Sequence, residues 1–209
     1  MLNLYFVRHG ETEWNVQNRL QGQLDSRLTS NGIQSARLLA RKLEATKFES
    51  VISSSSKRAV HTAELLIGNR PLSFRTDEHL LEINLGSWQG KTVEEIKKMD
   101  PHNYNCYFHH PNLYMRNENE TENFIDVKER LEAFLKTMQK TYQSGNLLIV
   151  THGMVIKVLQ MMCKSNSIKQ LWDPPAIEGT SLTVVRIEEG KRELLLEGSL
   201  SHKRGFPQV

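Results

Sequence analysis

The chain repeats one pattern at two distant places: a short apolar run followed by His-Gly. Residues 4–7 lead through an arginine to His9, and residues 147–151 lead directly to His152. Such runs are typical of buried strands in a mostly parallel sheet, and the first is too short to span a membrane. Ligands of open α/β sheets bind outside the carboxyl ends of the strands. The pattern therefore predicts a sheet with both histidines at the edge where a ligand would bind.

Two further stretches bring charged residues to similar positions. The strand-like residues 50–53 are followed by a serine-rich helix start and Arg58, and Glu82 lies in a loop that contains glycine. Serine is preferred at helix N-caps, so we expect the serines before Arg58 to cap that helix. Three strand ends would then deliver Arg8, Arg58 and the two histidines to one edge of the sheet.

The rest of the chain alternates between helical and strand-like periodicity. Apolar residues spaced three and four apart predict amphipathic helices, and short apolar runs bounded by turn residues predict strands. Helices are expected at about residues 30–43, 57–67, 93–100, 124–142, 154–163 and 167–172, a short strand at 72–76 and a hairpin at 180–197. This alternation predicts an α/β fold, a three-layer sandwich whose mostly parallel central sheet carries helices on both faces.

Composition and charge limit the classes of function. The 209 residues fit one domain spanning 1–209, and 38% hydrophobic with 24% charged residues indicate a globular protein. The net charge of +3 suits a phosphate-bearing partner, but the sequence has no dense basic stripe typical of nucleic-acid binders. Cys106 and Cys163 lack metal-site spacing. We therefore expect free thiols in the cytoplasm, and neither nucleic acid nor a membrane as partner.

Four stretches together resemble the motifs of a known family. They are Arg8-His9-Gly10-Glu11-Thr12 with Asn15, Arg58-Ala59 with Thr62-Ala63, Glu82, and His152-Gly153. In this order they resemble the histidine phosphatase superfamily, which includes cofactor-dependent phosphoglycerate mutases and broad-specificity phosphatases. The resemblance runs from about Leu2 to Val185. It implies a phosphoglycerate mutase-like fold and phosphoryl transfer through a phosphohistidine.

The resemblance implies a role for each charged residue of the predicted edge. His9 is expected to be the nucleophile, although the two His-Gly motifs by themselves do not distinguish it from His152. Arg8 and Arg58 would bind the phosphoryl oxygens and lower the pKa of His9, and a protonated His152 would add a third cation. Glu82 would act as general acid and base, or alternatively only pair with an arginine. This chemistry requires a His9 ring that a substrate can reach.

Four other residues are predicted to contact phosphate or substrate. Asn15 would donate an uncharged hydrogen bond, and Gly153 belongs to the second His-Gly motif. Gln21 and Gly22 lie in the polar loop at residues 17–27, which touches substrate in the resembling family. For Gln21, a place in a solvated loop is the alternative interpretation.

The least regular part of the chain is an aromatic segment within residues 100–121. We predict a lid or substrate wall there, with packing in the core as the alternative. The resembling mutases carry paired arginines in this region, whereas this chain has Arg116 and mainly aromatic residues. Of the family's Gly-Glu-Ser or Gly-Glu-Thr, Thr121-Glu122-Asn123 retains only the glutamate, so the resemblance leaves the role of Glu122 open.

Three functions remain as alternatives. We favour a phosphatase that hydrolyses a small, partly apolar phosphate monoester, because the paired arginines of the mutases are missing. A phosphoglycerate mutase would instead use 2,3-bisphosphoglycerate as cofactor. A non-catalytic phosphate-binding module is disfavoured, because every catalytic position is filled. The phosphatase would need neither metal ion nor other cofactor, since arginines supply the positive charge. Its partner would be a small phosphorylated metabolite, and the oligomeric state stays open.

Overall fold

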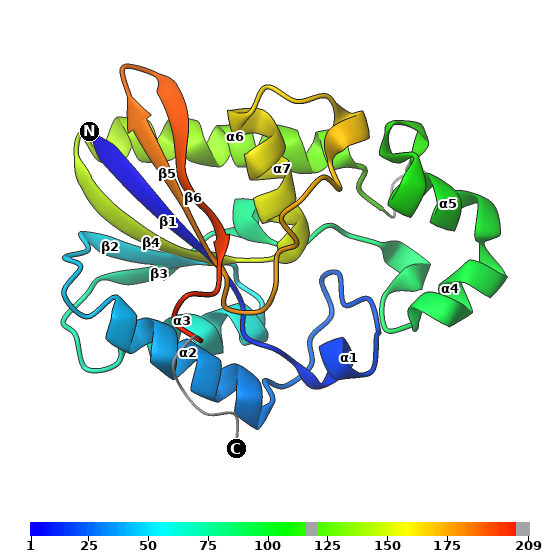
Figure 1. Ribbon diagram of the computed structural model, residues 1–209, viewed down its shortest axis with the longest axis horizontal. Coiled ribbons are helices and arrows are strands. Elements are labelled where there is room, and N and C mark those ends of the chain that lie inside the picture. The colour runs from blue at the N-terminus through cyan, green and yellow to red at the C-terminus, as the bar shows by residue number, and fades with distance from the viewer. Residues whose placement is uncertain (116–120, 204–209) are drawn as a thin grey trace.

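The computed structural model in Figure 1 describes residues 1–115 and 121–203. At its centre lies a six-stranded sheet with the spatial order β3-β2-β4-β1-β5-β6. The strands are β1 (Leu2–Arg8), β2 (Ser50–Ser53), β3 (Phe74–Thr76), β4 (Gly145–Thr151), β5 (Leu182–Glu188) and β6 (Lys191–Ser199). The first four strands of the chain run parallel to one another, whereas β5 is antiparallel to β1 and forms a hairpin with β6. The mostly parallel sheet and the late hairpin are confirmed.

The register between the two central strands places the two His-Gly motifs side by side. β1 and β4 pair in parallel with Arg8 opposite Thr151, so His9 and His152 each follow the last paired residue of a strand. The neighbouring β2 ends at Ser53, opposite Val150 of β4. Parallel neighbours therefore end at one edge, as predicted.

Helices cover both faces of the sheet, as Figure 1 shows. They are α2 (Ser30–Lys42) and α3 (Lys57–Ile67) on one face, and α6 (Phe124–Thr141) and α7 (Gly153–Cys163) on the other. Side chains of a strand point alternately to opposite faces. On β4, Leu147 packs in the core with α6 and α7, and the next residue, Leu148, in the core with α2 and α3. The predicted three-layer sandwich is confirmed.

Shorter elements complete the chain. They are α1 (Glu13–Val16), α4 (Val93–Met99) and α5 (Pro101–His109), with 3-10 turns η1 (Glu78–Leu80), η2 (Gly86–Trp88), η3 (Pro111–Leu113) and η4 (Ile168–Gln170). Figure 1 shows α1, α4 and α5 on the side of the molecule where β1 and β4 end. The aromatic pattern does not predict α5. Asp100 starts it by accepting a hydrogen bond from the Asn103 N–H, and Pro101 takes the first helical position.

Helix starts agree with the sequence at two helices and differ at a third. Thr29 caps α2, and Thr92 forms a capping box with Glu95 at α4. Ser56 occupies the N-cap of α3, but its side chain makes no capping hydrogen bond. The prediction that serines cap α3 is wrong. The side chain of Asp25 instead accepts hydrogen bonds from the free N–H groups at this helix end.

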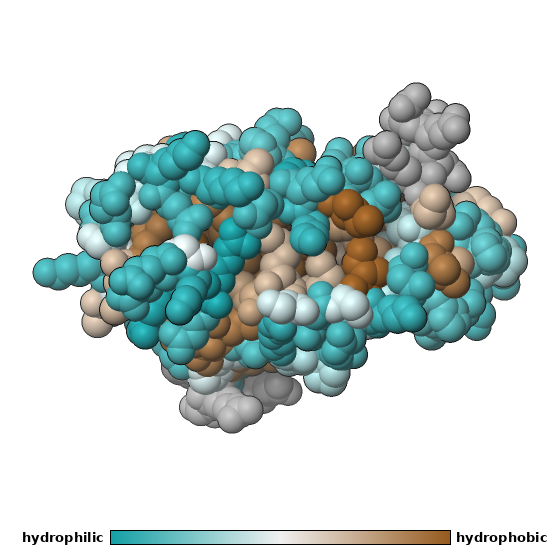
Figure 2. Space-filling view, turned by 90° about the horizontal axis from the view of Figure 1, so that it is seen from above, coloured by the Kyte–Doolittle hydropathy of each residue, from teal (hydrophilic) through white to brown (hydrophobic). Residues whose placement is uncertain are grey.

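The molecular surface is mainly hydrophilic in the view from above (Figure 2). Apolar residues gather there in a hollow near the middle of the face. Met99, Leu113 and Met115, near α4 and η3, are among the exposed large apolar side chains. In the described part of the chain, no helix combines the length and apolar character that crossing a bilayer requires.

Candidate active site

A small cavity opens where the strand ends meet. Arg8 and His9 at the end of β1, Arg58 at the start of α3 and Glu82 in the loop after η1 all line it. Its volume is about 100 Å³, and the other lining residues are Asn15, Arg19, Leu20, Gln21, Gly22, Ile83, Leu85 and Tyr107. The buried ring of His152 lies with its centre 5.2 Å from that of His9. The structure thus assembles the five residues that the sequence predicted to be catalytic.

The ring of His9 is oriented by a hydrogen bond to the backbone of the next residue, Gly10. Only 3% of the residue is exposed, but it lines the cavity. Its Nδ1 lies 2.8 Å from the Gly10 carbonyl oxygen. Because a carbonyl only accepts, Nδ1 carries the proton, and the neutral ring keeps its lone pair on Nε2. Burial first, then the charges of Arg58 and Arg8, hold the pKa of His9 well below its usual value. The predicted lowering is confirmed, with burial as its largest cause.

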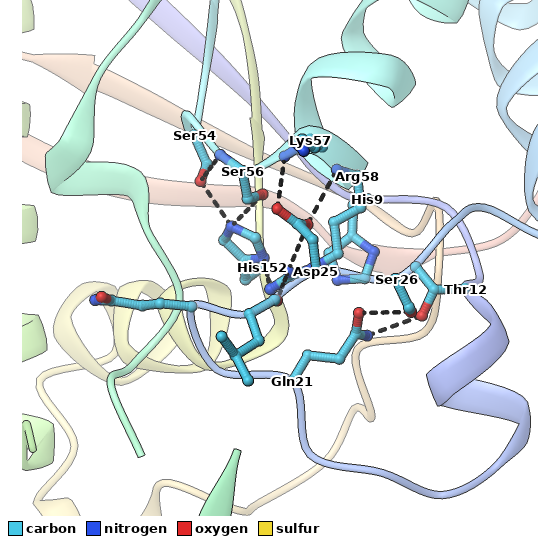
Figure 3. Close-up of polar contacts among 12 residues, drawn as sticks. His9, Thr12, Gln21, Asp25, Ser26, Ser54, Ser56, Lys57, Arg58 and His152 are labelled. Carbon is cyan, nitrogen blue, oxygen red and sulfur yellow. Dashed lines mark hydrogen bonds and ion pairs between the residues drawn. The ribbon is translucent and has the colours of Figure 1, made fainter. Parts of the chain in front are cut away.

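His152 differs from the prediction, because its ring is neutral. Its Nδ1 accepts a hydrogen bond from Arg58 Nη2 at 3.1 Å, so this nitrogen carries no proton. Its Nε2 lies 2.8 Å from Ser54 Oγ and 3.4 Å from Ser56 Oγ (Figure 3). Burial, followed by the charge of Arg58, lowers the pKa of His152 well below its usual value. The prediction of a third cation here is wrong, since a buried imidazole beside a guanidinium does not bind a second proton.

Arg58 is almost fully occupied by protein partners. Its side chain is 1% exposed. Nη1 donates to the Leu24 carbonyl and to Asp25 Oδ1, and Nη2 donates to the Gly22 carbonyl and to His152 Nδ1. All four Nη hydrogens are therefore used, whereas the buried Nε has no hydrogen-bond partner. An unpaired buried donor in the wall of a cavity is suited to bind an anion.

Arg8 has more donors to spare. Nη1 donates to the Ile177 carbonyl at 2.6 Å, and Nε is buried without a partner. A guanidinium stays protonated at any physiological pH even when buried. The cavity therefore has two permanent cations in its wall together with His9, and each cation has a buried Nε–H without a partner.

Glu82 is held by backbone groups and not by an arginine. Its Oε1 accepts a hydrogen bond from the Ile83 N–H at 3.0 Å, and its Oε2 accepts one from the Met154 N–H at 3.2 Å, at the start of α7. Among the ion pairs between described residues, none joins Glu82 to Arg8 or Arg58. The arrangement is thus not the simple ion pair that was the alternative to an acid–base role.

Asn15 and Gln21 both line the cavity but differ in what they offer to it. Asn15 Oδ1 accepts hydrogen bonds from the N–H and hydroxyl of Thr12, which leaves its amide nitrogen as a donor. Gln21 uses both ends of its amide, because Nε2 donates to Thr12 Oγ1 at 2.8 Å and Oε1 accepts from Ser26 at 3.0 Å (Figure 3). For Gln21 the contacts favour a role in shaping the loop.

The two predicted binding glycines serve different purposes. Gly22 has φ = +52°, which favours glycine, and an added Cβ would lie 2.2 Å from Gln89 Oε1. Its carbonyl accepts a hydrogen bond from Arg58, so Gly22 helps to hold that guanidinium. Gly153 begins α7 beside Arg8, where an added Cβ would meet the Arg8 Nε at the ordinary contact distance of 3.7 Å.

Glu122, whose role the resemblance leaves open, stabilises the loop that carries Glu82. Its Oε2 accepts a hydrogen bond from the Asn84 N–H at 2.9 Å, and its own N–H donates to the Asn84 carbonyl at 2.9 Å. Arg130 of α6 donates to both carboxylate oxygens at 2.8 and 3.3 Å. Glu122 therefore ties the loop to α6 and does not line the cavity.

A second, larger and more apolar cavity adjoins the first. Its volume is about 460 Å³, and it shares Arg8, Leu20, Glu82 and Tyr107 with the small cavity. The rest of its lining is Phe108, Gly153, Met154, Lys157, Trp172, Pro174, Ala176 and Ile177. Figure 2 shows apolar residues gathered between the helices over the sheet and the α4–α5 end of this face. The shared residues place the acid–base candidate Glu82 between a polar and an apolar compartment.

The aromatic segment is divided between a cavity wall and the core, and its role as a lid or substrate wall stays a prediction. Phe108 stacks against Trp172 with ring centres 5.9 Å apart and lines the large cavity. Cys106 and Tyr114 are buried in the core. Residues 116–120, including Arg116, lie outside the described part of the chain.

The comparison with known families agrees with this geometry. The family described as "Histidine phosphatase superfamily (branch 1)" matches residues 4–199. The chain belongs to this superfamily. The resemblance seen in the sequence motifs is thereby confirmed over nearly the whole chain.

Several relatives of this chain match it along most of their length. The solved structure of YhfR from Bacillus stearothermophilus is 40% identical, with a TM-score of 0.92 over 97% of this chain and 99% of that one. Phosphoglycerate mutase-like protein 4 of Arabidopsis thaliana is 31% identical, over 97% of this chain and 88% of the relative. Phosphoserine phosphatase 1 of Hydrogenobacter thermophilus is 27% identical, over 93% and 91%.

Three residues of the candidate site were missed by the sequence analysis. Arg19 lines the small cavity and is anchored to the Gly90 carbonyl at 2.8 Å. Asp25 binds Arg58, and Ser54 binds His152. None belongs to a quoted motif. The polar loop at residues 17–27 and the serine run were the signals present, but they do not indicate which side chain reaches the site.

Proposed function

We propose that this histidine phosphatase hydrolyses a phosphate monoester with an apolar or aromatic leaving group, through a phosphohistidine on His9. The observation that carries the proposal is the cavity lined by the neutral His9, with its free Nε2 lone pair, and by Arg8 and Arg58, each of which has a buried Nε–H without a partner. A transferring phosphoryl group carries negative charge on its oxygens, so its transfer depends mainly on positioning and on such donors.

In the first step, His9 Nε2 attacks phosphorus and the bond from phosphorus to the leaving oxygen breaks. The protonated Glu82 carboxyl gives its proton to that oxygen, and an alcohol or phenol leaves. The hydrogen bond from Nδ1 to the Gly10 carbonyl stabilises the ring as it gains positive charge. Glu82 suits the acid role because it lies in the walls of both cavities, between the phosphoryl group and the leaving group.

In the second step, a water molecule attacks the phosphohistidine and the N–P bond breaks. The Glu82 carboxylate takes the proton of this water and is ready for another cycle. Inorganic phosphate is released, and His9 returns to the neutral state. Asn15 would donate its amide N–H to a phosphoryl oxygen in both steps.

The large cavity supports the choice of leaving group. Its apolar walls include Phe108, Trp172 and Ile177, and its volume of about 460 Å³ exceeds that of the small cavity. Pockets of this size, with few polar groups, bind apolar ligands through buried area. Phosphoserine phosphatase 1, the relative named above, carries phosphatase in its name and so supports hydrolysis in this superfamily.

A phosphoglycerate mutase is the second candidate, favoured by the relative named phosphoglycerate mutase-like protein 4. It would use 2,3-bisphosphoglycerate, return the phosphoryl group to a phosphoglycerate and exclude water. The apolar lining of the large cavity speaks against it, because a phosphoglycerate brings a carboxylate and a hydroxyl to that wall. A non-catalytic module would leave the free lone pair of His9 without a use.

We further propose that hydrolysis needs no metal ion or other cofactor and occurs in the cytoplasm. Among the described residues, no three His, Cys, Asp or Glu side chains group closely enough to hold a metal ion. The free thiols Cys106 and Cys163 fit a reducing compartment.

A substrate panel with EDTA present tests the proposal. It contains 1-naphthyl phosphate, p-nitrophenyl phosphate, phosphoserine and 3-phosphoglycerate, the last also with 2,3-bisphosphoglycerate. We expect release of phosphate, fastest from the naphthyl ester, and an acid-labile phosphoenzyme. Efficient interconversion of phosphoglycerates would favour the mutase, and activity lost to EDTA would contradict the metal-free mechanism.

A further inference from the structure

The start of α3 is capped from a loop more than thirty residues away in the sequence. Asp25 Oδ2 accepts a hydrogen bond from the Lys57 N–H at 2.9 Å, and Oδ1 accepts one from the Arg58 N–H at 3.2 Å. Ser56, at the N-cap position, makes no such bond with its side chain. A carboxylate is favourable there because the first N–H groups of a helix have no partner within the helix.

The same carboxylate also holds the side chain of Arg58. Asp25 Oδ1 lies 2.8 Å from Arg58 Nη1, in an ion pair whose arginine side chain is 1% exposed and whose aspartate side chain is 25% exposed. Figure 3 shows Asp25 between the backbone at Lys57 and the guanidinium. Backbone and side chain of one arginine are thus bound by one residue, which fixes where the guanidinium lies relative to the helix.

The loop around Asp25 completes the hold on Arg58. The carbonyls of Gly22 and Leu24 accept from Nη2 and Nη1, and the last Nη hydrogen goes to His152. With both Nη groups turned to the loop and to His152, the Nε edge is left without a partner in the buried wall. The contacts of the loop and of His152 therefore leave Nε as the one N–H of the guanidinium without a protein partner among the described residues.

We propose that Asp25 is a positioning residue that aims the Nε edge of Arg58 at the phosphoryl site. Asp25 does not line either cavity, so it acts through Arg58 and not on the substrate. This inference deepens the proposed function and rests on it only in one respect, that a phosphoryl group or phosphate occupies the small cavity.

The cap also affects the second histidine. The hydroxyls of Ser54 and Ser56 lie 2.8 and 3.4 Å from His152 Nε2, next to the helix start that Asp25 caps. Arg58 Nη2, held by the same loop, binds the other ring nitrogen at 3.1 Å. Asp25 thereby supports the neutral tautomer of His152 as well as the direction of Arg58.

A positioning role and a purely electrostatic role predict opposite effects on anion binding. If Asp25 only neutralised Arg58, then Asp25→Asn would make the site more positive and bind phosphate more tightly. If Asp25 aims the guanidinium, the same variant binds phosphate more weakly. The neutral amide is a poorer acceptor than the carboxylate, and its NH2 group cannot accept a hydrogen bond from the Lys57 N–H.

The test compares Asp25→Asn with Asp77→Asn. Asp77 is a matched control, because it accepts from the His79 N–H at 3.0 Å and pairs with Arg75 at 3.2 Å, and it lines neither cavity. Inorganic phosphate and orthovanadate are the probes, measured by calorimetry and as inhibitors of p-nitrophenyl phosphate hydrolysis. We expect Asp25→Asn to weaken both by about 10- to 100-fold and to lower kcat, with Asp77→Asn unchanged.

Unchanged or tighter phosphate binding by a folded Asp25→Asn protein would overturn the proposal, as would an equal loss in Asp77→Asn. Melting temperature and circular dichroism report folding. If Asp25→Asn does not fold, Asp25→Glu is used in its place. The proposal then requires that Asp25→Glu binds phosphate more weakly than wild type while its melting temperature stays the same. Wild-type protein that binds phosphate in this Asp25-dependent way but hydrolyses no ester would contradict the proposed function and leave this inference standing.

Discussion

The two adjoining cavities share a wall but are built from different parts of the fold. The small one is polar and forms where parallel strands end, with Arg8 and His9 set by the register of β1 and β4 and Arg58 supplied by the start of α3. The large one is mainly apolar and forms between α5 and the segment that contains Trp172, neither of which belongs to the sheet. Under the proposed function, the edge of the sheet supplies the reacting groups, and elements outside the sheet select the leaving group.

The largest effect is expected from a substitution in the polar cavity. His9→Ala should lower kcat/KM for every ester by at least about 10⁴-fold, because it removes the nucleophile and not a binding contact. Steady-state kinetics and acid-quenched phosphoenzyme measure this. His61→Ala, at an exposed histidine on α3, is the control. Turnover that survives His9→Ala and disappears in His152→Ala would move the nucleophile to the other His-Gly motif.

Glu82→Gln acts where the two cavities meet. We expect losses of about 10²- to 10⁴-fold for alkyl phosphates, whose leaving oxygen needs a proton. For p-nitrophenyl phosphate the loss in the first step should be much smaller, since nitrophenolate leaves without one. Kinetics on both esters give the ratio, and Glu78→Gln, at an exposed position in η1, is the control. Equal losses for both esters would argue against proton donation.

Trp172→Ala should act on the apolar cavity alone. Its ring stacks on Phe108, and its Nε1 donates to the Tyr107 carbonyl at 2.6 Å. We expect kcat/KM to fall about tenfold for 1-naphthyl phosphate and to change little for glycerol phosphate, which does not fill the pocket. Phe74→Ala, at an exposed aromatic residue of β3, is the control. Loss of the same size for both esters would mean that the wall supports the fold and does not select the substrate.

A smaller effect, which distinguishes the two cavities, is expected in the pH dependence of the free energy of unfolding. Burial lowers the pKa of His9 and of His152 in the folded protein, so the unfolded chain binds protons that the folded one does not. The free energy of unfolding should therefore fall as the pH drops below about 6.5, on the order of 1 kcal/mol for each histidine at pH 5.5. Urea titrations at several pH values measure it. His9→Ala should flatten the slope, whereas Trp172→Ala should leave it unchanged.

His202 adds to the same trend outside both cavities. Burial lowers its pKa to about 4, and its Nε2 lies 3.0 Å from Thr180 Oγ1. The Thr180 N–H in turn donates to the Arg8 carbonyl at 3.0 Å. We expect His202→Gln to flatten the pH dependence of stability with little effect on kcat. A steeper dependence in this variant would contradict the neutral state of His202.

The sequence by itself determined the fold class and the meeting of the motif residues. Alternating strand and helix periodicities imply a covered parallel sheet, and parallel strands end at a common edge, so Arg8, His9, Arg58 and His152 had to converge. Both inferences, the fold class and the convergence of the motif residues, depend on local patterns that lie within single short stretches of the chain. The order of the strands in the sheet and the register between β1 and β4 then follow from packing.

Only the tertiary structure decided the state of the site. The neutral ring of His152, the capping of α3 by Asp25 and the stacking of Phe108 on Trp172 each join residues more than thirty positions apart. Hydrogen bonds to buried groups depend on angles and distances that no spacing in the chain encodes. The serines before Arg58 illustrate this, because serine often caps helices, but here a carboxylate from a distant loop caps the helix and two serine hydroxyls lie against a histidine.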